Sequence, residues 1–185
     1  MPDATLDYRR IFLGLPVAAI VARDRVMTDC NDLALELFRA ERSEIVGNLF
    51  AVLYPNRTEF EAAGRRMEPF LAGCVVQLDN RIMRRIDGTH FWVTVRGHAF
   101  NREMPHEMTA WAFSELSDDV GPQKTAISLT RRERDVAALL IDGLTSKQIA
   151  IDLGISPKTV DIHRANLLKK YSVHATSDLI KILVN

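Results

Sequence analysis

The last 57 residues of this 185-residue chain contain four short segments whose helix start and stop signals are written in the sequence. Thr130 can cap the first of these helices, and Glu133, three residues later, completes a capping box. Gly143 follows the apolar run of this helix and acts as a stop signal. The first helix is therefore expected over residues 131–142.

Two further helices follow, joined by a tight turn. Thr145 caps the second helix, and Gly154 turns the chain into a third helix expected over residues 157–171. Ser156 supplies the N-cap of this third helix, and Pro157 occupies its first turn. Two helices joined in this way form a helix-turn-helix.

The third helix separates into two faces when it is laid out at 100° per residue. Val160, Leu167 and Tyr171 fall together and are expected to pack inward. The opposite face mixes charged, polar and small residues, which suits the major groove of DNA better than a protein core. The residues expected to read bases are Lys158, Asp161, Ile162, Ala165 and Asn166.

Hydroxyl and cationic side chains surround this face and are expected to contact DNA phosphates. They are Thr145, Ser146, Lys147, Thr159, Arg164, Lys169 and Lys170.

A fourth helix, capped by Thr176, carries more apolar residues than one side of a short terminal helix needs to pack on a small domain, so some are expected to face a second subunit. The alternative is that all four cover the core of the helix-turn-helix. Apolar residues ahead of the first strand are expected to form a second pairing helix. We therefore expect a homodimer, which would place two recognition helices on half-sites about 10 base pairs apart. The dimerisation candidates are Leu6, Ile11, Phe12, Leu179, Ile180, Leu183 and Val184.

The C-terminal segment, taken as a domain over residues 128–185, resembles the LuxR-type (NarL/FixJ-type) DNA-binding domain. The resemblance implies a sequence-specific transcription regulator. Asp161 departs from the pattern, because many family members have a Lys there, and its carboxylate is expected to accept a hydrogen bond from a cytosine amino group. Ala175-Thr176 stands where an Arg is common. The matching positions are Thr130, Arg132, Glu133, Gly143, Leu144, Thr145, Lys147, Ile149, Ala150, Leu153, Ile155, Ser156, Thr159, Val160, His163 and Lys170.

Residues 1–117 show a different order: two strands, then short helices, then three strands. Asn31 after the second strand and the run IDGTHFWVTV around Asp87-Gly88 resemble a PAS domain. This resemblance implies an α+β domain with an antiparallel five-stranded sheet that senses a signal or mediates pairing. The expected elements are strands over 17–22, 26–29, 74–86, 91–95 and 106–116, and a long helix over 58–71.

Two other N-terminal domains occur in relatives of the DNA-binding domain. A phosphoacceptor receiver requires alternating strands and helices and a lone Asp after an apolar strand, which this order does not match. An acyl-homoserine-lactone-binding domain is usually longer than this space. Residues 118–127 are acidic and broken by Gly121-Pro122, so we expect a linker there.

An apolar lining in the PAS-like domain is expected either to enclose a small molecule or to be filled by its own side chains. No haem cofactor is indicated, because the long helix has no His, and the Cys motif of flavin photosensors is missing. Scattered histidines and the separate Cys30 and Cys74 match no metal template or disulfide framework. The candidate pocket residues are Ile20, Phe38, Phe50, Phe60, Leu78, Val93 and Trp111.

Charge is divided unevenly although the formal net charge is zero. From Lys124 onward there are 10 Lys and Arg residues against 6 Asp and Glu, which leaves 14 against 18 in the first 123 residues. The basic excess accompanies the expected DNA-binding part. No apolar run or signal peptide indicates a membrane, so a cytoplasmic location is expected.

No constellation of residues indicates an enzyme, because a phosphate loop, a nucleophile beside a base and metal-ligand spacing are all missing. The expected partners are double-stranded DNA and a second copy of the chain. RNA polymerase and a small-molecule ligand are further candidates. One alternative function is that of an adaptor whose helical domain binds protein. The other is that of a response regulator whose N-terminal domain is a divergent phosphoacceptor receiver.

Overall fold

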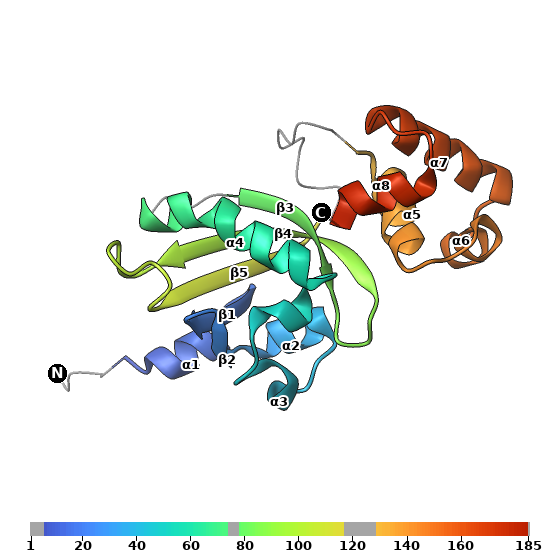
Figure 1. The fold of residues 1–185 in the computed structure, drawn as a ribbon. Helices are drawn as coiled ribbons and strands as arrows, with labels where there is room; N and C mark the ends of the chain where they lie inside the picture. The colour runs from blue at the N-terminus through green and yellow to red at the C-terminus, as the bar shows by residue number, and fades with distance from the viewer. Residues whose placement is uncertain (1–5, 74–77, 117–128, 185) are drawn as a thin grey trace.

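The computed structural model describes residues 6–73, 78–116 and 129–184, which form a sheet-based N-terminal part and a helical C-terminal part (Figure 1). Within these ranges no helix is both long and apolar enough to span a bilayer. The expected linker over 118–127 lies outside the described residues.

The N-terminal part is built on one antiparallel sheet with the strand order β2-β1-β5-β4-β3. This confirms the expected α+β domain with five strands. Strand β3 begins at Leu78 in the described residues, and the first part of the strand expected over 74–86 lies outside them. The strands are β1 Ala18–Arg23, β2 Val26–Cys30, β3 Leu78–Arg84, β4 His90–Ala99 and β5 Thr109–Glu115.

The junction after the second strand depends on Asn31, which is fully buried. Its Oδ1 accepts hydrogen bonds from the Ala19 and Ala34 amides at 2.9 and 3.0 Å. Its Nδ2 donates to the Val17 carbonyl at 2.8 Å. One side chain therefore caps helix α2 and ties it to β1, which satisfies buried backbone groups that would otherwise lose their hydrogen bonds.

Helices cover one face of this sheet, and α4 lies over it and runs roughly along its strands (Figure 1). Phe38 of α2 makes edge-to-face contacts with Phe91 and Phe113, with ring centroids 5.8 and 5.2 Å apart. Such aromatic pairs stabilise a core beyond the area they bury. The elements are α1 Tyr8–Leu13, α2 Asp32–Phe38, α3 Arg42–Ile45, the 3-10 helix η1 Phe50–Leu53 and α4 Arg57–Ala72.

The burial of β3 differs from the sequence expectation. Residues of a strand alternate between its two faces, so Leu78 and Arg81 lie on opposite faces, and Leu78 was expected in the pocket. In the structure Leu78 is 39% exposed, whereas Arg81 is 5% exposed. Burial of Arg81 is tolerated because its guanidinium pairs with Asp79 and donates to the Tyr54 hydroxyl at 2.6 Å.

The C-terminal part contains the four expected helices, α5 Arg131–Ile141, α6 Ser146–Leu153, α7 Pro157–Lys170 and α8 Thr176–Val184. Helices α5 and α7 each end one residue earlier than the sequence predicted, because Asp142 and Tyr171 are their C-caps. Thr176 is the first residue of α8 rather than a cap that precedes it.

Leu179 of α8 is fully buried in the core of the helical part, together with Val136, Ile149, Val160 and Leu167. Its expected role in dimerisation is therefore wrong, because no surface remains for a partner. Tyr171 packs against the same core, as its place on the inner stripe of α7 predicted.

Candidate nucleic-acid interface and ligand cavity

The turn between α6 and α7 fixes how α7 is presented. Gly154 has a φ of +63°, a left-handed conformation that favours glycine. The Ser156 hydroxyl then accepts a hydrogen bond from the Thr159 amide at 3.1 Å, and Pro157 opens the helix. The two helices thereby form the expected helix-turn-helix.

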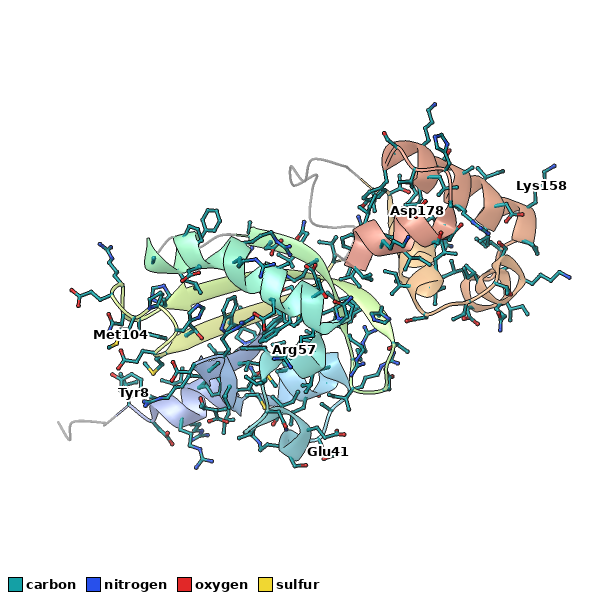
Figure 2. The ribbon with its side chains drawn as sticks, viewed as in Figure 1. Tyr8, Glu41, Arg57, Met104, Lys158 and Asp178 are labelled. Carbon is teal, nitrogen blue, oxygen red and sulfur yellow. The ribbon has the colours of Figure 1, made fainter. Side chains whose placement is uncertain are left out.

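The outer face of α7 is exposed at all five positions expected to read bases. Ile162 leaves 53% of its surface in solvent, a large apolar exposure that a thymine methyl group could cover. Lys158 projects away from the rest of the molecule at the beginning of the helix (Figure 2). The N-terminal part therefore leaves this face of the helix open.

Ser146 and Asp161 are joined by a hydrogen bond, because the Ser146 hydroxyl donates to the Asp161 carboxylate at 2.8 Å. The bond ties the first turn of α6 to the outer face of α7. A carboxylate accepts several hydrogen bonds, so Asp161 keeps capacity for a base amino group.

Lys170 differs from the sequence expectation of a phosphate contact. Its Nζ lies 2.6 Å from Oε2 of Glu133, whose side chain is only 4% exposed. Burial opposes ionisation of this carboxyl, but the hydrogen bonds from Lys170 and from Thr130 outweigh it and lower the Glu133 pKa. The lysine side chain is 34% exposed, and its ammonium is held against the buried carboxylate, which requires a counter-charge.

Arg164 is likewise engaged within the domain. Its Nε donates to the Thr176 hydroxyl at 2.6 Å, which fastens α8 to α7. Arg164 therefore positions two helices instead of pointing to the open face.

The remaining phosphate candidates stay at the surface. Lys147 and Lys169 are exposed, and neither has an ion pair among the described residues. Thr145 caps α6 through a capping box with Gln148, and the Thr159 hydroxyl bonds to Ser156 at 2.8 Å. The free cationic groups thus flank the helix-turn-helix on α6 and at the end of α7.

A second site is a cavity of about 40 Å³ between α4 and the sheet. One water needs roughly 10–15 Å³ on this measure, so the cavity has room for a molecule of a few heavy atoms. Of the seven candidate pocket residues, Phe50, Phe60 and Trp111 line it. Ile20, Phe38 and Val93 pack in the solid core instead. The full lining is Arg25, Phe50, Tyr54, Phe60, Ala63, Gly64, Met67, Leu71, Met83, Val95, His106, Thr109, Trp111 and Phe113.

The cavity presents few polar groups, and most are already bonded. The Trp111 indole donates to the Thr109 hydroxyl at 2.8 Å and lies over Gly97, where a Cβ would come within 2.5 Å of the ring. Arg25 stacks on the Phe60 ring at 3.5 Å. Burial raises the Tyr54 pKa, against the opposing charge of Arg81, so this hydroxyl keeps its proton as a donor.

Several lining residues were not found from the sequence. Met67 and Leu71 lie one turn apart on the inner face of α4, so the helical period of this segment could have placed them. Arg25 carried no comparable signal. Its place at the cavity depends on an ion pair with Glu61 at 3.1 Å, 36 residues away. The described part of the chain contains no cluster of three potential metal ligands.

Known proteins resemble both parts. Residues 6–108 match the model of the PAS fold, and residues 127–183 match that of the bacterial regulatory proteins of the luxR family. The transcriptional regulatory protein UhpA of Salmonella typhimurium is 60% identical over 45 residues, which cover 24% of this chain and 23% of UhpA. FixJ of Rhizobium meliloti is 35% identical over 89 residues, which cover 48% of this chain and 43% of FixJ. The chain spans less than a third of the first curated relatives it matches.

One solved structure resembles the N-terminal part. It is the PAS domain, in complex with ethanol, of a LuxR-family transcriptional regulator from Burkholderia thailandensis. It is 39% identical, covers 60% of this chain and 98% of that chain, and superposes with a TM-score of 0.57. With its five-stranded sheet and a match to the PAS model over more than half of its length, the chain belongs to the PAS family, and its C-terminal part is a helix-turn-helix domain of the luxR type.

Proposed function

We propose that this protein is a cytoplasmic transcription regulator that binds duplex DNA with α7 in the major groove. The open outer face of α7 carries this proposal, because its five candidate base-reading residues are exposed and the N-terminal part does not cover them. The flanking Lys147 and Lys169 supply positive charge for phosphates. An enzymatic role has no comparable support.

Salt dependence tests this proposal. Phosphate contacts release counterions, so the logarithm of affinity for duplex DNA falls linearly with the logarithm of salt concentration. We expect such a slope for the full chain with a fluorescent duplex. An adaptor that used the helical domain to bind RNA polymerase or another protein would show no salt-dependent duplex binding, and that result would contradict the proposal.

We further propose that the protein acts as a homodimer. Helix α1 has no buried residue, and its Tyr8 and Ile11 are 75% and 48% exposed. Leu6, just ahead of the helix, is 62% exposed, whereas Phe12 is half-buried. Tyr8 lies at the opposite end of the molecule from Lys158 (Figure 2), so pairing through α1 leaves the recognition helix free. Ile180, Leu183 and Val184 of α8 are half-buried and form the second pairing surface.

We also propose that a small neutral molecule in the PAS cavity controls DNA affinity. The lining is mainly apolar, and the charge of Arg25 is already balanced by Glu61. The Tyr54 hydroxyl supplies a hydrogen-bond donor. The Burkholderia thailandensis relative has a PAS domain in complex with ethanol, a molecule of this size and polarity.

A further inference from the structure

The two parts of the chain touch along one end of the sheet. Figure 1 shows α5 and α8 nearest to the sheet, with α6 and α7 on the far side, and α5 packs on β4. On the face of β4 that α4 does not cover, Arg96 and His98 are exposed, whereas His90 and Trp92 are not. The DNA-binding domain therefore covers only the first half of this strand.

His90 and Asp142 form the polar centre of this contact. The His90 ring Nδ1 bonds to one carboxylate oxygen of Asp142, and the His90 amide donates to the other at 3.5 Å. The two side chains are 12% and 13% exposed. A hydrogen bond to a charged group in such a sheltered place is stronger than a surface pair.

The rest of this interface is loosely packed. A hollow of about 210 Å³ lies between Trp92 and the face of α5 that contains Asp135, Ala138 and Leu139. Two buried nitrogens at the contact, Nε2 of His90 and Nε1 of Trp92, have no hydrogen-bond partner among the described residues. Buried polar atoms without a hydrogen-bond partner oppose docking, which lowers the free energy needed to separate the two domains.

Asn56 makes the second connection, and it also belongs to the cavity side of the molecule. Its Oδ1 accepts from the Glu59 amide at 2.8 Å and caps α4, the helix that roofs the cavity. Its Nδ2 donates to the Val184 carbonyl in the last turn of α8 at 3.1 Å. A shift of the first turn of α4 therefore moves a group that holds α8.

We propose that these two contacts form a latch that holds the DNA-binding domain against the PAS domain and restrains it from pairing on DNA. While Val184 is bound to Asn56, the end of α8 is turned toward its own PAS domain and away from a second subunit. Ligand in the cavity acts on the latch through α4 and Asn56. This inference rests on the proposed dimeric DNA binding and names its regulation.

Neutral substitutions in the PAS domain test the latch without changing the charge of the DNA-binding face. His90→Ala removes the bond to Asp142. Asn56→Ser keeps a side chain that caps α4 but cannot reach Val184. We expect each variant of the full chain to bind duplex DNA about fivefold or more tightly, the lower end of usual allosteric coupling. His98→Ala, on the same face of β4 but outside the contact, is the matched control and should bind as the unchanged protein does.

Small-angle X-ray scattering without DNA separates the latch from the proposed function. A larger radius of gyration in His90→Ala and Asn56→Ser, with no change in His98→Ala, is expected. An unchanged radius, or DNA affinity that is equal or weaker in both variants, would overturn the latch. A larger radius in a protein that binds no duplex would leave the domain contact standing and refute the proposed function instead.

Discussion

Ser146 donates a hydrogen bond to Asp161 across the two helices of the helix-turn-helix, at 2.8 Å. This bond orients the carboxylate, which we expect to accept a further bond from a cytosine amino group. Asp161→Ala should relax the preference at one base pair by about 1–3 kcal/mol. Nonspecific affinity should be unchanged or tighter because a negative charge is lost. Anisotropy titrations with matched and mismatched duplexes measure both quantities.

Ser146→Ala is the control for this substitution. It removes the bond between the helices but leaves the carboxylate on α7, so the base preference should fall less than in Asp161→Ala. Uniformly weaker binding of Asp161→Ala to matched and mismatched duplexes would show that the carboxylate supports the fold and does not read a base.

Lys147 and Lys169 are expected to anchor phosphates. Lys147→Ala and Lys169→Ala should each weaken binding to every sequence and reduce the salt slope by about one unit, since one phosphate contact is lost. Lys181→Ala, on the exposed side of α8, should leave the slope unchanged. If either substitution changed the preferred DNA sequence and left the salt slope unchanged, the assignment of that lysine as a phosphate contact would be wrong.

The Glu133–Lys170 pair predicts how stability depends on pH. The Glu133 pKa is lower in the folded protein than its usual 4.5. Its stabilisation is therefore complete above that value and is lost as the pH falls through the folded pKa. Glu133→Gln should cost about 1–3 kcal/mol at pH 7 and should remove this acid-dependent loss. Urea unfolding followed by circular dichroism measures both, and an equal acid sensitivity in the variant would contradict the assignment.

Pairing through α1 predicts different effects at the two ends of the chain. Ile11→Glu should shift sedimentation of the full chain from dimer toward monomer, because a charge enters an apolar contact. Ile180→Glu should weaken DNA binding more than it weakens the dimer. A full-length protein that is monomeric without substitution, and that binds a palindrome without cooperativity, would refute this scheme.

The cavity predicts a response to short alcohols. Millimolar ethanol should raise the melting temperature of the protein, because a ligand that binds only the folded state stabilises it. Ala63→Leu places three more carbons in the cavity and should abolish this response while the variant remains folded. If Ala63→Leu kept the full response, ethanol would be binding elsewhere.

The helical half was predictable because its signals are local. The capping box of Thr130 and Glu133, the Ser156 cap and the Gly154 turn all act within four residues, and each is present in the structure. The contact of Lys170 with the buried Glu133 carboxylate was not predictable, because the two residues are 37 positions apart in the sequence. The helical period of a sequence predicts which residues lie on the same face of a helix. It does not predict which of them form ion pairs or hydrogen bonds with other helices.

The order of strands and helices in the PAS domain was predictable from the sequence, whereas the residues that line its cavity were less so. Alternation along β3 separated Leu78 from Arg81 but did not show that both faces of the strand contain buried residues, with Ile82 3% and Met83 1% exposed. Burial of Arg81 depends on Asp79 and Tyr54, whose groups satisfy the arginine. Likewise, the bond between His90 and Asp142 joins residues of different domains, and no local pattern indicates it.

Selection from a pool of random duplexes tests the central claim most directly. The full chain should enrich an inverted repeat whose half-sites lie about 10 base pairs apart, or a multiple of that, because two α7 helices related by a two-fold axis read the same groove face. A pool that shows no enriched sequence after selection, or a single unrepeated half-site, would contradict the account of a dimeric regulator that reads DNA with α7.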